Sequence, residues 1–397
     1  MVRGGFRLSA DNEQMSLVVI RPCAGYSDEA AEAALQSVLA PLGGLDWVTP
    51  GMRVAVKANL ISAMKPEAAA TTHPVLLAAL TRLLTARGAA VTVGDSPGGV
   101  YNRVYVEHVY EVCGLKALEA AGAALNRDYS IRELANPEGK VLKALTYTAW
   151  LDGADAIINF SKLKVHAMMG MTAATKNMFG VVPGSVKAEY HYRFPDYADF
   201  ADMLVDLNQR FRPRLNLCDA VVGMEGNGPT QGTPKPIGAL LASASPYELD
   251  LAAASLIGLT KETVPYLEAA YRRGLLPAGS ADLELDGDLA AFRPDRFRLV
   301  AARDDLTQLV GGQSPVRKLV RAAAQRVLRA SPALDPAKCV GCGVCVKACP
   351  AKAIALAHGK ACIHRGACIR CFCCQELCPR GAMHVQRPLA ARIAGRL

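Results

Sequence analysis

Two stretches repeat one cysteine pattern, CVGCGVCVKACP at residues 339–350 and CIRCFCCQELCP at residues 368–379. In each, three cysteines separated by two residues precede a fourth cysteine and a proline, which is the spacing of the bacterial iron–sulfur run. The fourth cysteine of each run binds the cluster of the other run in two-cluster ferredoxins. The spacing therefore predicts two [4Fe-4S] clusters with crossed ligands: Cys339, Cys342, Cys345 and Cys378 for one, and Cys368, Cys371, Cys374 and Cys349 for the other.

Two zinc sites are the alternative interpretation of these cysteines. Zinc sites usually use paired CxxC motifs, whereas here a third cysteine and a CxxxCP segment follow. The pattern therefore favours clusters. Two further cysteines in this region are expected to be non-ligands. Cys362 lies on the return strand of a hairpin expected over 354–363, which turns at His358-Gly359, and Cys373 precedes the ligand Cys374.

Composition bounds the class of protein. The chain has 397 residues, of which 51% are hydrophobic and 20% charged, enough for a large core and two to three domains. Thirteen cysteines, eight of them claimed by clusters, indicate a reducing compartment, and the N-terminal residues contain no apolar secretory segment. No apolar run is long enough to span a membrane. We therefore expect a cytoplasmic protein without a transmembrane segment.

The net charge of +9 is concentrated from residue 332 onward. Iron–sulfur clusters bound by four thiolates carry negative charge, so these basic residues partly neutralise them. Nucleic-acid binding is not expected, because the basic residues are not interleaved with aromatic residues and no recognition motif is present.

Apolar runs alternate with amphipathic ones through most of the chain. Strands are expected over 17–22, 53–57, 90–93, 154–160, 214–222, 237–242 and 297–301, and helices over 28–42, 74–87, 197–211 and 246–259. This alternation predicts an α/β fold with a mostly parallel, layered sheet, followed by a small α+β ferredoxin-type domain. The expected domains are an N-terminal extension (1–16), an α/β domain of one or two lobes (17–313), a linker helix (314–331), the two-cluster domain (332–387) and a basic tail (388–397).

The helix expected over 316–330 is basic and amphipathic. It has two interpretations. It either packs its apolar face on the α/β domain as a connecting strut, or it lies on an anionic membrane surface. We favour the strut, because the helix is short and contains no aromatic residue.

Polar residues recur where the predicted strands end. Ligands of doubly wound sheets bind beyond the carboxyl ends of the strands, so these side chains are expected to share a pocket. Any one lysine or histidine among them is also compatible with an ordinary surface or structural role. The glycine-rich loop at 223–232 does not have the GxGxxG pattern, so no dinucleotide site is expected. The residues assigned to ligand binding are Lys57, Asn59, Asp95, Ser96, Lys164, Lys176, Asn177, His191, Glu225 and Asn227.

The lysines, with Lys187 added, would make a positive pocket that suits a carboxylate or phosphate. A histidine beside such a ligand can donate a proton while an electron arrives from a cluster. We assign this catalytic role to His166, His73 and Lys162.

Several long motifs carry a family resemblance: VAVKANLIS (54–62), TTHP (71–74), GDSPGG (94–99), INFSKLKVHAMMGMTAATKNMFG (158–180), KAEYH (187–191), DAVVGMEGNGPTQG (219–232) and SPYELD (245–250). Over residues 17–302 the chain resembles the domain of unknown function 362 family, in which a fused two-cluster ferredoxin domain is common. The resemblance implies an iron–sulfur protein, and some members are thought to deliver low-potential electrons to reductases. The family is also distantly similar to lactate-racemase-type proteins, which implies a further, unidentified cofactor as an option. Ser245 stands where an acidic residue is usual.

These observations favour an iron–sulfur oxidoreductase that passes low-potential electrons through two [4Fe-4S] clusters to an anionic small-molecule substrate or cofactor. The alternative is a ferredoxin-type electron carrier whose large domain docks a partner reductase. In either case a redox partner protein is expected. A non-redox enzyme with structural clusters is less favoured, because two clusters with crossed ligands form a relay.

Overall fold

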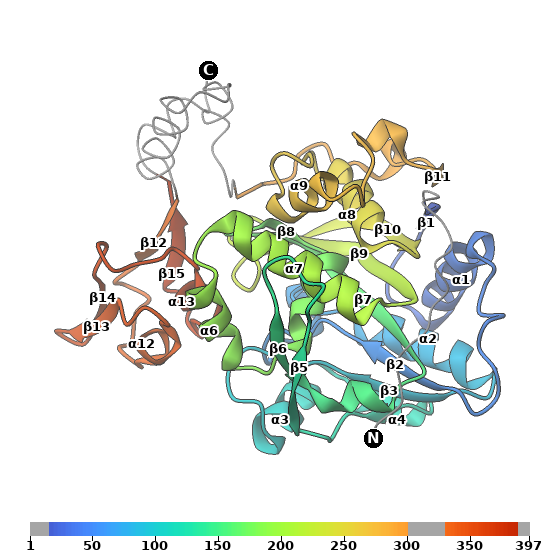
Figure 1. The fold of residues 1–397 in the computed structure, drawn as a ribbon, viewed down its shortest axis with the longest axis horizontal. Helices are drawn as coiled ribbons and strands as arrows, with labels where there is room; N and C mark the ends of the chain where they lie inside the picture. Colours follow the sequence, from blue (N-terminus) through green and yellow to red (C-terminus); the bar gives the residue numbers. More distant parts are fainter. Residues whose placement is uncertain (1–15, 301–329, 388–397) are drawn as a thin grey trace.

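The computed structural model describes residues 16–300 and 330–387 (Figure 1). Nearly all of the expected N-terminal extension and of the linker helix, and the whole basic tail, lie outside the described residues. In the described part of the chain, no helix is both long and apolar enough to cross a membrane.

One nine-stranded sheet organises the large domain. Its order is β11-β1-β10-β9-β7-β2-β3-β4, with β8 paired to the end of β7. The strands from β9 to β4 run parallel, whereas β10 is antiparallel to both β9 and β1. The expected mostly parallel sheet is thus confirmed. The strands are β1 (Val18–Pro22), β2 (Arg53–Lys57), β3 (Ala90–Gly94), β4 (Ala124–Leu125), β7 (Ala156–His166), β8 (Gly170–Thr172), β9 (Leu215–Glu225), β10 (Thr233–Ser243) and β11 (Leu285–Asp286).

Helices cover both faces of this sheet. One face packs against α1 (Asp28–Leu39), α2 (Pro74–Thr85), α3 (Arg103–Val112) and α4 (Ala117–Ala120). The other packs against α5 (Ala174–Asn177), α6 (Val186–Arg193), α7 (Tyr197–Phe211), α8 (Pro246–Leu256) and α9 (Pro265–Arg272). The strands alternate between these layers, since Val54 and Val56 enter the first core and Ala55 the second. Both faces are therefore buried, as expected for a largely parallel sheet.

Side-chain caps fix several helix starts. Ser27 accepts a hydrogen bond from the Ala30 amide at the start of α1, and Asp196 accepts one from Ala198 at the start of α7. Ser245, the departure from the family pattern, accepts one from the Glu248 amide and caps α8. A serine at this position is therefore explained by helix capping.

Two expected strands need correction, and one hairpin was not expected. The strand expected over 154–160 runs on to His166, because its second half pairs with β9 and then with β8. Residues 297–300 of the strand expected at 297–301 are not a strand. Instead, the Arg298 carbonyl accepts a hydrogen bond from the Gly226 amide. The hairpin of β5 (Ile131–Ala135) and β6 (Ala144–Thr148) was not expected.

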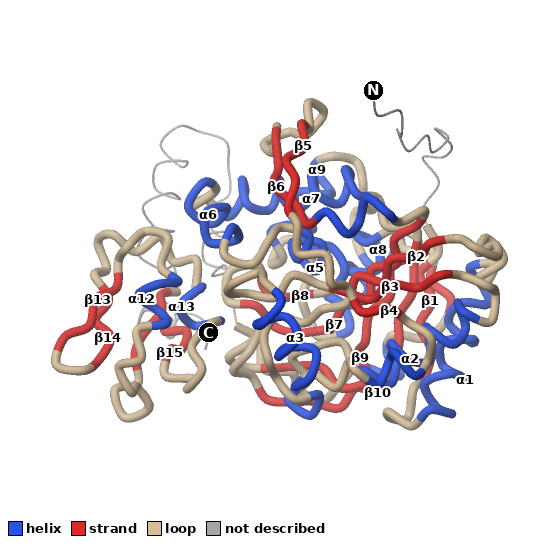
Figure 2. Tube along the Cα trace, turned by 90° about the horizontal axis from the view of Figure 1, so that it is seen from below, coloured by secondary structure: helices blue, strands red, loops and turns tan. Residues whose placement is uncertain are grey.

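The cluster domain is a small α+β unit at one side of the large domain (Figures 1 and 2). Strands β12 (Ser331–Leu334) and β15 (Met383–Gln386) pair antiparallel. Strands β13 (Ile354–Ala357) and β14 (Lys360–Ile363) form the hairpin expected around His358-Gly359. Two short helices, α12 (Val344–Ala348) and α13 (Cys373–Glu376), each carry one of the expected ligands, Cys345 and Cys374.

Candidate functional site

The side chains of the two cysteine sets are grouped as the crossed pattern requires. Cys339, Cys342, Cys345 and Cys378 all line one small cavity of the cluster domain, which we call the outer site. Around the second set, burial raises the pKa of the Cys368 thiol, and the neighbouring Cys371 and Cys349 raise it further. Cys349 therefore lies near Cys368 and Cys371 rather than with its own run, and we call Cys349, Cys368, Cys371 and Cys374 the inner site.

The backbone around both sites suits thiolate ligands. The Ala353 amide donates to Cys349 Sγ at 3.2 Å, and the Ala382 amide donates to Cys378 Sγ at 3.3 Å. Amides of Ala361 and Gly341 lower the pKa of Cys339. Such hydrogen bonds to sulfur are typical of iron–sulfur sites. The residues present therefore fit two [4Fe-4S] clusters.

The two cysteine runs differ at the two positions where the backbone has a positive, left-handed φ. The first has glycines there, Gly341 (φ 68°) and Gly343 (φ 75°), whereas the second has Arg370 (φ 58°) and Phe372 (φ 63°). A left-handed conformation costs a residue other than glycine about 1–2 kcal/mol. Phe372 is 1% exposed and belongs to the hydrophobic core of the large domain. Burying its ring contributes about 1.5–3 kcal/mol, which offsets the strain. Phe372 thus anchors the cluster domain.

Phe372→Ala should lower the free energy of unfolding by about 3–5 kcal/mol, because it leaves a cavity without relieving the strained backbone. Phe372→Gly should be about 1 kcal/mol less destabilising than the alanine variant, because glycine accepts a positive φ. Denaturant unfolding of the metal-loaded protein, followed by its visible absorbance, compares the two. An alanine variant more stable than the glycine variant would contradict this account.

The loop after β9 holds the cluster domain through polar contacts. The Gln375 amide donates to the Asn227 carbonyl at 2.8 Å, and Asn227 Nδ2 donates to the Met383 carbonyl at 3.3 Å. Thr230 and Gln231 donate to the carbonyls of Glu376 and Cys378. This part of the glycine-rich loop 223–232 therefore cradles the second cysteine run.

A cavity of about 370 Å³ lies between the two domains. The large domain contributes the carboxyl ends of β2, β3 and β7 together with α5 and α6, and the cluster domain contributes residues of α12 and α13. We call it the interdomain cavity. Eight of the predicted site residues line it: Asn59, Asp95, Ser96, Lys164, His166, Lys176, Asn177 and His191. Lys187, expected among the lysines of the pocket, lines it as well.

The floor of the interdomain cavity is a buried hydrogen-bond network. Lys164 Nζ donates to Asn59 Oδ1 at 2.7 Å and to the Ala70 carbonyl at 2.6 Å. Asn59 in turn donates to Asn177 Oδ1 at 2.9 Å. Burial lowers the pKa of Lys164 to about 7. Two hydrogen bonds therefore hold the Lys164 amine in place at the floor of the cavity.

Lys57 lies beneath the cavity and does not line it. Its Nζ is 2.7 Å from Asp95 Oδ1, and both side chains are buried. A Cβ at Gly180 would lie 2.2 Å from Asp95 Oδ1, so only glycine fits beside this ion pair. We infer that Lys57 and Asp95 hold the β2 and β3 ends together.

Lys176 is a large-domain lysine of the cavity whose Nζ lies against aromatic rings. Its Nζ lies 4.6 Å from the Phe179 ring centroid and 5.8 Å from that of Phe200. Within residues 16–300 and 330–387 its ammonium contacts these two rings and no hydrogen-bond acceptor or ion-pair partner. Burial lowers its pKa, and the Glu376 carboxylate opposes this effect. The ammonium donors of Lys176 are therefore free for an anionic ligand.

Asp250 fixes the helix that carries Lys176. Its two carboxylate oxygens accept from the amides of Ala174 and Thr175 at 2.7 and 2.8 Å. Burial raises the pKa of Asp250 to about 7 in spite of these bonds. Asp250, in the SPYELD motif, was not predicted as a site residue and is a positioning residue for Lys176.

Two histidines and a glutamate complete the polar lining. His166 Nε2 lies 3.1 Å from Glu376 Oε1, but neither atom has a well-aligned hydrogen bond within the described residues. His191 Nδ1 is also buried without a partner in this part of the chain. Its ring stacks on Phe200 at 4.4 Å. Buried polar atoms without partners mark positions where the polar groups of a ligand fit.

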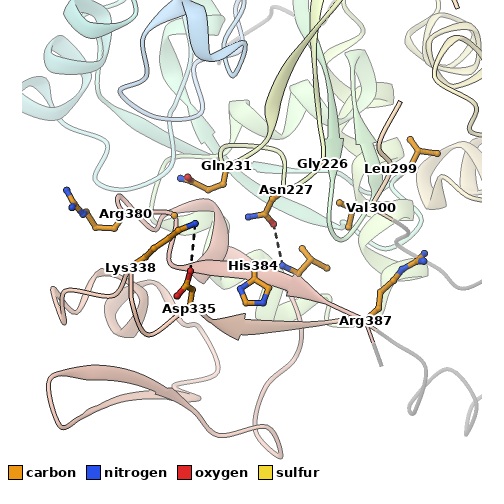
Figure 3. Close-up of a pocket in the computed structure, with 12 residues that line it drawn as sticks. Gly226, Asn227, Gln231, Leu299, Val300, Asp335, Lys338, Arg380, His384 and Arg387 are labelled. Carbon is orange, nitrogen blue, oxygen red and sulfur yellow. Dashed lines mark hydrogen bonds and ion pairs between the residues drawn. The ribbon is translucent and has the colours of Figure 1, made fainter. Parts of the chain in front are cut away.

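Five predicted site residues do not line the interdomain cavity. Besides Lys57, these are Lys162, His73, Glu225 and Asn227. Lys162 Nζ bonds Asp219 Oδ2 and the Tyr26 hydroxyl, both at 2.8 Å. His73 stacks on Tyr26 at 3.6 Å and caps α2. Glu225 pairs with Arg298, and Asn227 lines a different groove (Figure 3).

Comparison with known proteins agrees with this architecture. The protein family described as "Domain of unknown function (DUF362)" matches residues 54–255 of the chain. The chain belongs to the DUF362 family. A 4Fe-4S dicluster domain matches residues 331–379. The "Thylakoid-associated protein sll1697" of Synechocystis sp. is 32% identical over 263 residues, which are 64% of this chain and 78% of that protein.

The lactate racemase apoprotein of Thermoanaerobacterium thermosaccharolyticum is a distant structural neighbour of this DUF362 protein. Its TM-score is 0.39 at 10% identity, and the match covers 61% of this chain and 57% of that chain. A match this weak carries no inference about a cofactor or an active site.

Among the residues of the DUF362 interdomain cavity that sequence reasoning missed are Cys373 and Glu376. Both lie in the second cysteine run, where every polar residue was interpreted through the clusters alone. Glu376 could have been noticed in the sequence, because it is an acidic residue in a basic cluster domain and lies between the ligands Cys374 and Cys378.

Proposed function

We propose that this protein is an iron–sulfur oxidoreductase that delivers electrons to a small anionic substrate or cofactor in the interdomain cavity. One observation carries the proposal. A cavity lined by Lys164, Lys176 and His166 is closed on its other side by α13, the helix that carries the inner-site ligand Cys374. The helix α13 would thus contact both the bound electron acceptor and the cluster that supplies the electrons. When bound, the two clusters would supply single electrons.

The chain's own residues explain how an anion would bind. Lys176 would pair with a carboxylate or phosphate, because its ammonium has no acceptor in the described residues. Lys187 is held by the Ser96 and Val182 carbonyls, both at 2.6 Å, and would add positive charge. Phe179, Ile61 and Leu377 would contact the apolar part of the ligand. This lining favours a small carboxylate with an apolar body.

Reduction of a C=C or C=O bond consumes two electrons and two protons, so proton donors must reach the ligand. His166 Nδ1 accepts from the Met168 and Met169 amides at 3.1 and 3.3 Å. The proton of the neutral ring is therefore on Nε2, which faces the Glu376 side of the cavity. Burial lowers the pKa of His166, so this neutral form is favoured. Lys164 is therefore the proposed proton donor, and His166 would polarise the reacting bond through its Nε2–H.

Native mass spectrometry of anaerobically purified protein tests the proposal. Two clusters and an additional small-molecule mass are expected, and the reduced protein should be reoxidised by that molecule. His166→Ala should slow this reoxidation while leaving the iron content unchanged. A protein with two zinc ions, or unchanged turnover in His166→Ala, would contradict the cluster assignment or the role of His166.

Anion affinity in the cavity should depend on pH. Burial lowers the pKa of Lys164 and of Lys187 to about 7, so both are charged at pH 6 and largely neutral at pH 8.5. The cavity therefore loses positive charge as pH rises, and the Kd for a carboxylate should rise by up to about tenfold per pH unit above 7 for each required ammonium. Titration calorimetry with benzoate from pH 6 to 8.5 measures this. A Kd independent of pH would contradict it.

The second candidate is a ferredoxin-type carrier whose large domain docks a reductase. The exposure of Cys342 favours it, because a carrier needs a cluster near the surface. A carrier would show two clusters and no bound small molecule in the same mass spectrum. Both candidates need reduced thiols, so we also propose a cytoplasmic location.

A further inference from the structure

The two cluster sites differ in their access to solvent. In the outer site Cys342 is exposed, and two neighbouring apolar side chains are also exposed, Val340 at 61% and Leu356 at 47%. The other three outer-site cysteines are buried. In the inner site Cys371 and Cys374 are buried and Cys349 and Cys368 are partly buried, so none of its thiols is exposed, and α13 faces the interdomain cavity. An electron donor in solution would therefore reach the protein at the outer site.

The surface around the outer site is basic. Residues 330–387 contain eight Lys and Arg residues and two acidic ones, Asp335 and Glu376. Glu376 lines the interdomain cavity, and Asp335 lies 3.8 Å from Lys338. Apart from the charge of the clusters themselves, little negative charge therefore remains on the exposed side of the cluster domain.

Specific contacts place basic side chains beside the outer site. Lys360 Nζ donates to the Cys339 carbonyl at 2.6 Å. Arg380 lines the outer-site cavity itself, together with Val340 and Leu356. Lys338 and Arg380 also border the neighbouring groove (Figure 3). The result is a small apolar centre with a basic rim.

We propose that this outer face, formed by Lys338, Val340, Cys342, Leu356, Lys360 and Arg380, docks an acidic electron-transfer protein. The partner would lose one electron and this protein would gain one, with no bond or proton transferred. Charge complementarity argues for this occupant: a basic rim attracts an acidic protein, and redox complexes are small, transient and strongly steered by charge. The proposal does not depend on what binds in the interdomain cavity.

The test is a binding measurement on the metal-loaded protein. The probe is an acidic plant-type [2Fe-2S] ferredoxin, and its Kd is measured at low and high ionic strength. The variant is Lys338→Glu with Lys360→Glu. The matched control is Arg132→Glu with Lys143→Glu, which makes the same change in charge at exposed residues of the β5–β6 hairpin on the large domain. The single variant Lys338→Glu reports on the same face without altering the Lys360 contact or a residue of the outer-site cavity.

The double variant should weaken ferredoxin binding by more than tenfold at low salt, and the control by less than twofold. The Kd of the unmodified protein should rise with salt. Iron content and reduction by dithionite should be unchanged in Lys338→Glu, whose Kd should still rise. Equal weakening in the variant and the control would overturn the proposal. So would binding of duplex DNA or anionic vesicles, but not ferredoxin, at this face.

Discussion

Lys176→Met should abolish most of the affinity of the interdomain cavity for small carboxylates. Methionine is an unbranched side chain one atom shorter than lysine that still reaches Phe179, but it lacks the ammonium, whose contacts in the described residues are the rings of Phe179 and Phe200. A hydrogen bond to a charged group contributes about 1.5–3 kcal/mol, so Kd should rise about 10- to 100-fold. Calorimetry with benzoate and with inorganic phosphate measures the change.

The matched control is Lys261→Met. Lys261 also lies over an aromatic ring, 4.7 Å from the Tyr271 centroid, but it is remote from the interdomain cavity. Its replacement should leave the anion Kd unchanged. Equal losses in both variants would mean that the anion is attracted by overall charge, and an unaffected Lys176→Met protein would remove Lys176 from the binding site.

Cys378→Ser should destroy the outer cluster, although Cys378 belongs to the second run in sequence. Cys378 lines the outer-site cavity together with Cys339, Cys342 and Cys345. Cys349→Ser should instead destroy the inner cluster, since Cys349 lies by Cys368. Each variant should retain about half of the iron, because each cluster needs its four thiolates. Iron analysis and electron paramagnetic resonance of the reduced protein measure the loss.

Cys373→Ser is the internal control, because Cys373 neighbours a ligand but lies toward the interdomain cavity. It should retain both clusters and their magnetic coupling. A cluster lost in Cys373→Ser and kept in Cys349→Ser would contradict the ligand assignment.

Much of the fold follows from local patterns. The strand 53–57 has the bounds expected from its apolar run, and α7 has those expected from its helical periodicity. The second half of β7 could not be predicted, because Lys162, Lys164 and His166 interrupt the apolar pattern. These side chains are buried only because distant residues pair with them, such as Asp219 for Lys162 and Asn59 for Lys164. Sequence spacing carries no record of such partners.

The candidate site was predictable to the extent that it depends on sheet geometry. Lys164, Asp95 and Asn177 meet because parallel strands and their connections bring their carboxyl ends to one edge. The same rule placed Lys162 and His73 there, yet both face a separate network around Tyr26 and Asp219. Glu376 was beyond reach, because its place in the cavity depends on how two domains pack.

The anchoring of Phe372 in the large domain implies an order for the protein's biogenesis. Phe372 is buried in the core of the large domain, and its neighbours Cys371 and Cys374 are buried as well. Machinery that inserts metal needs access to its target thiols. We therefore expect the inner cluster to be inserted before the cluster domain docks through Phe372. Repair of that cluster after oxygen damage should accordingly require undocking.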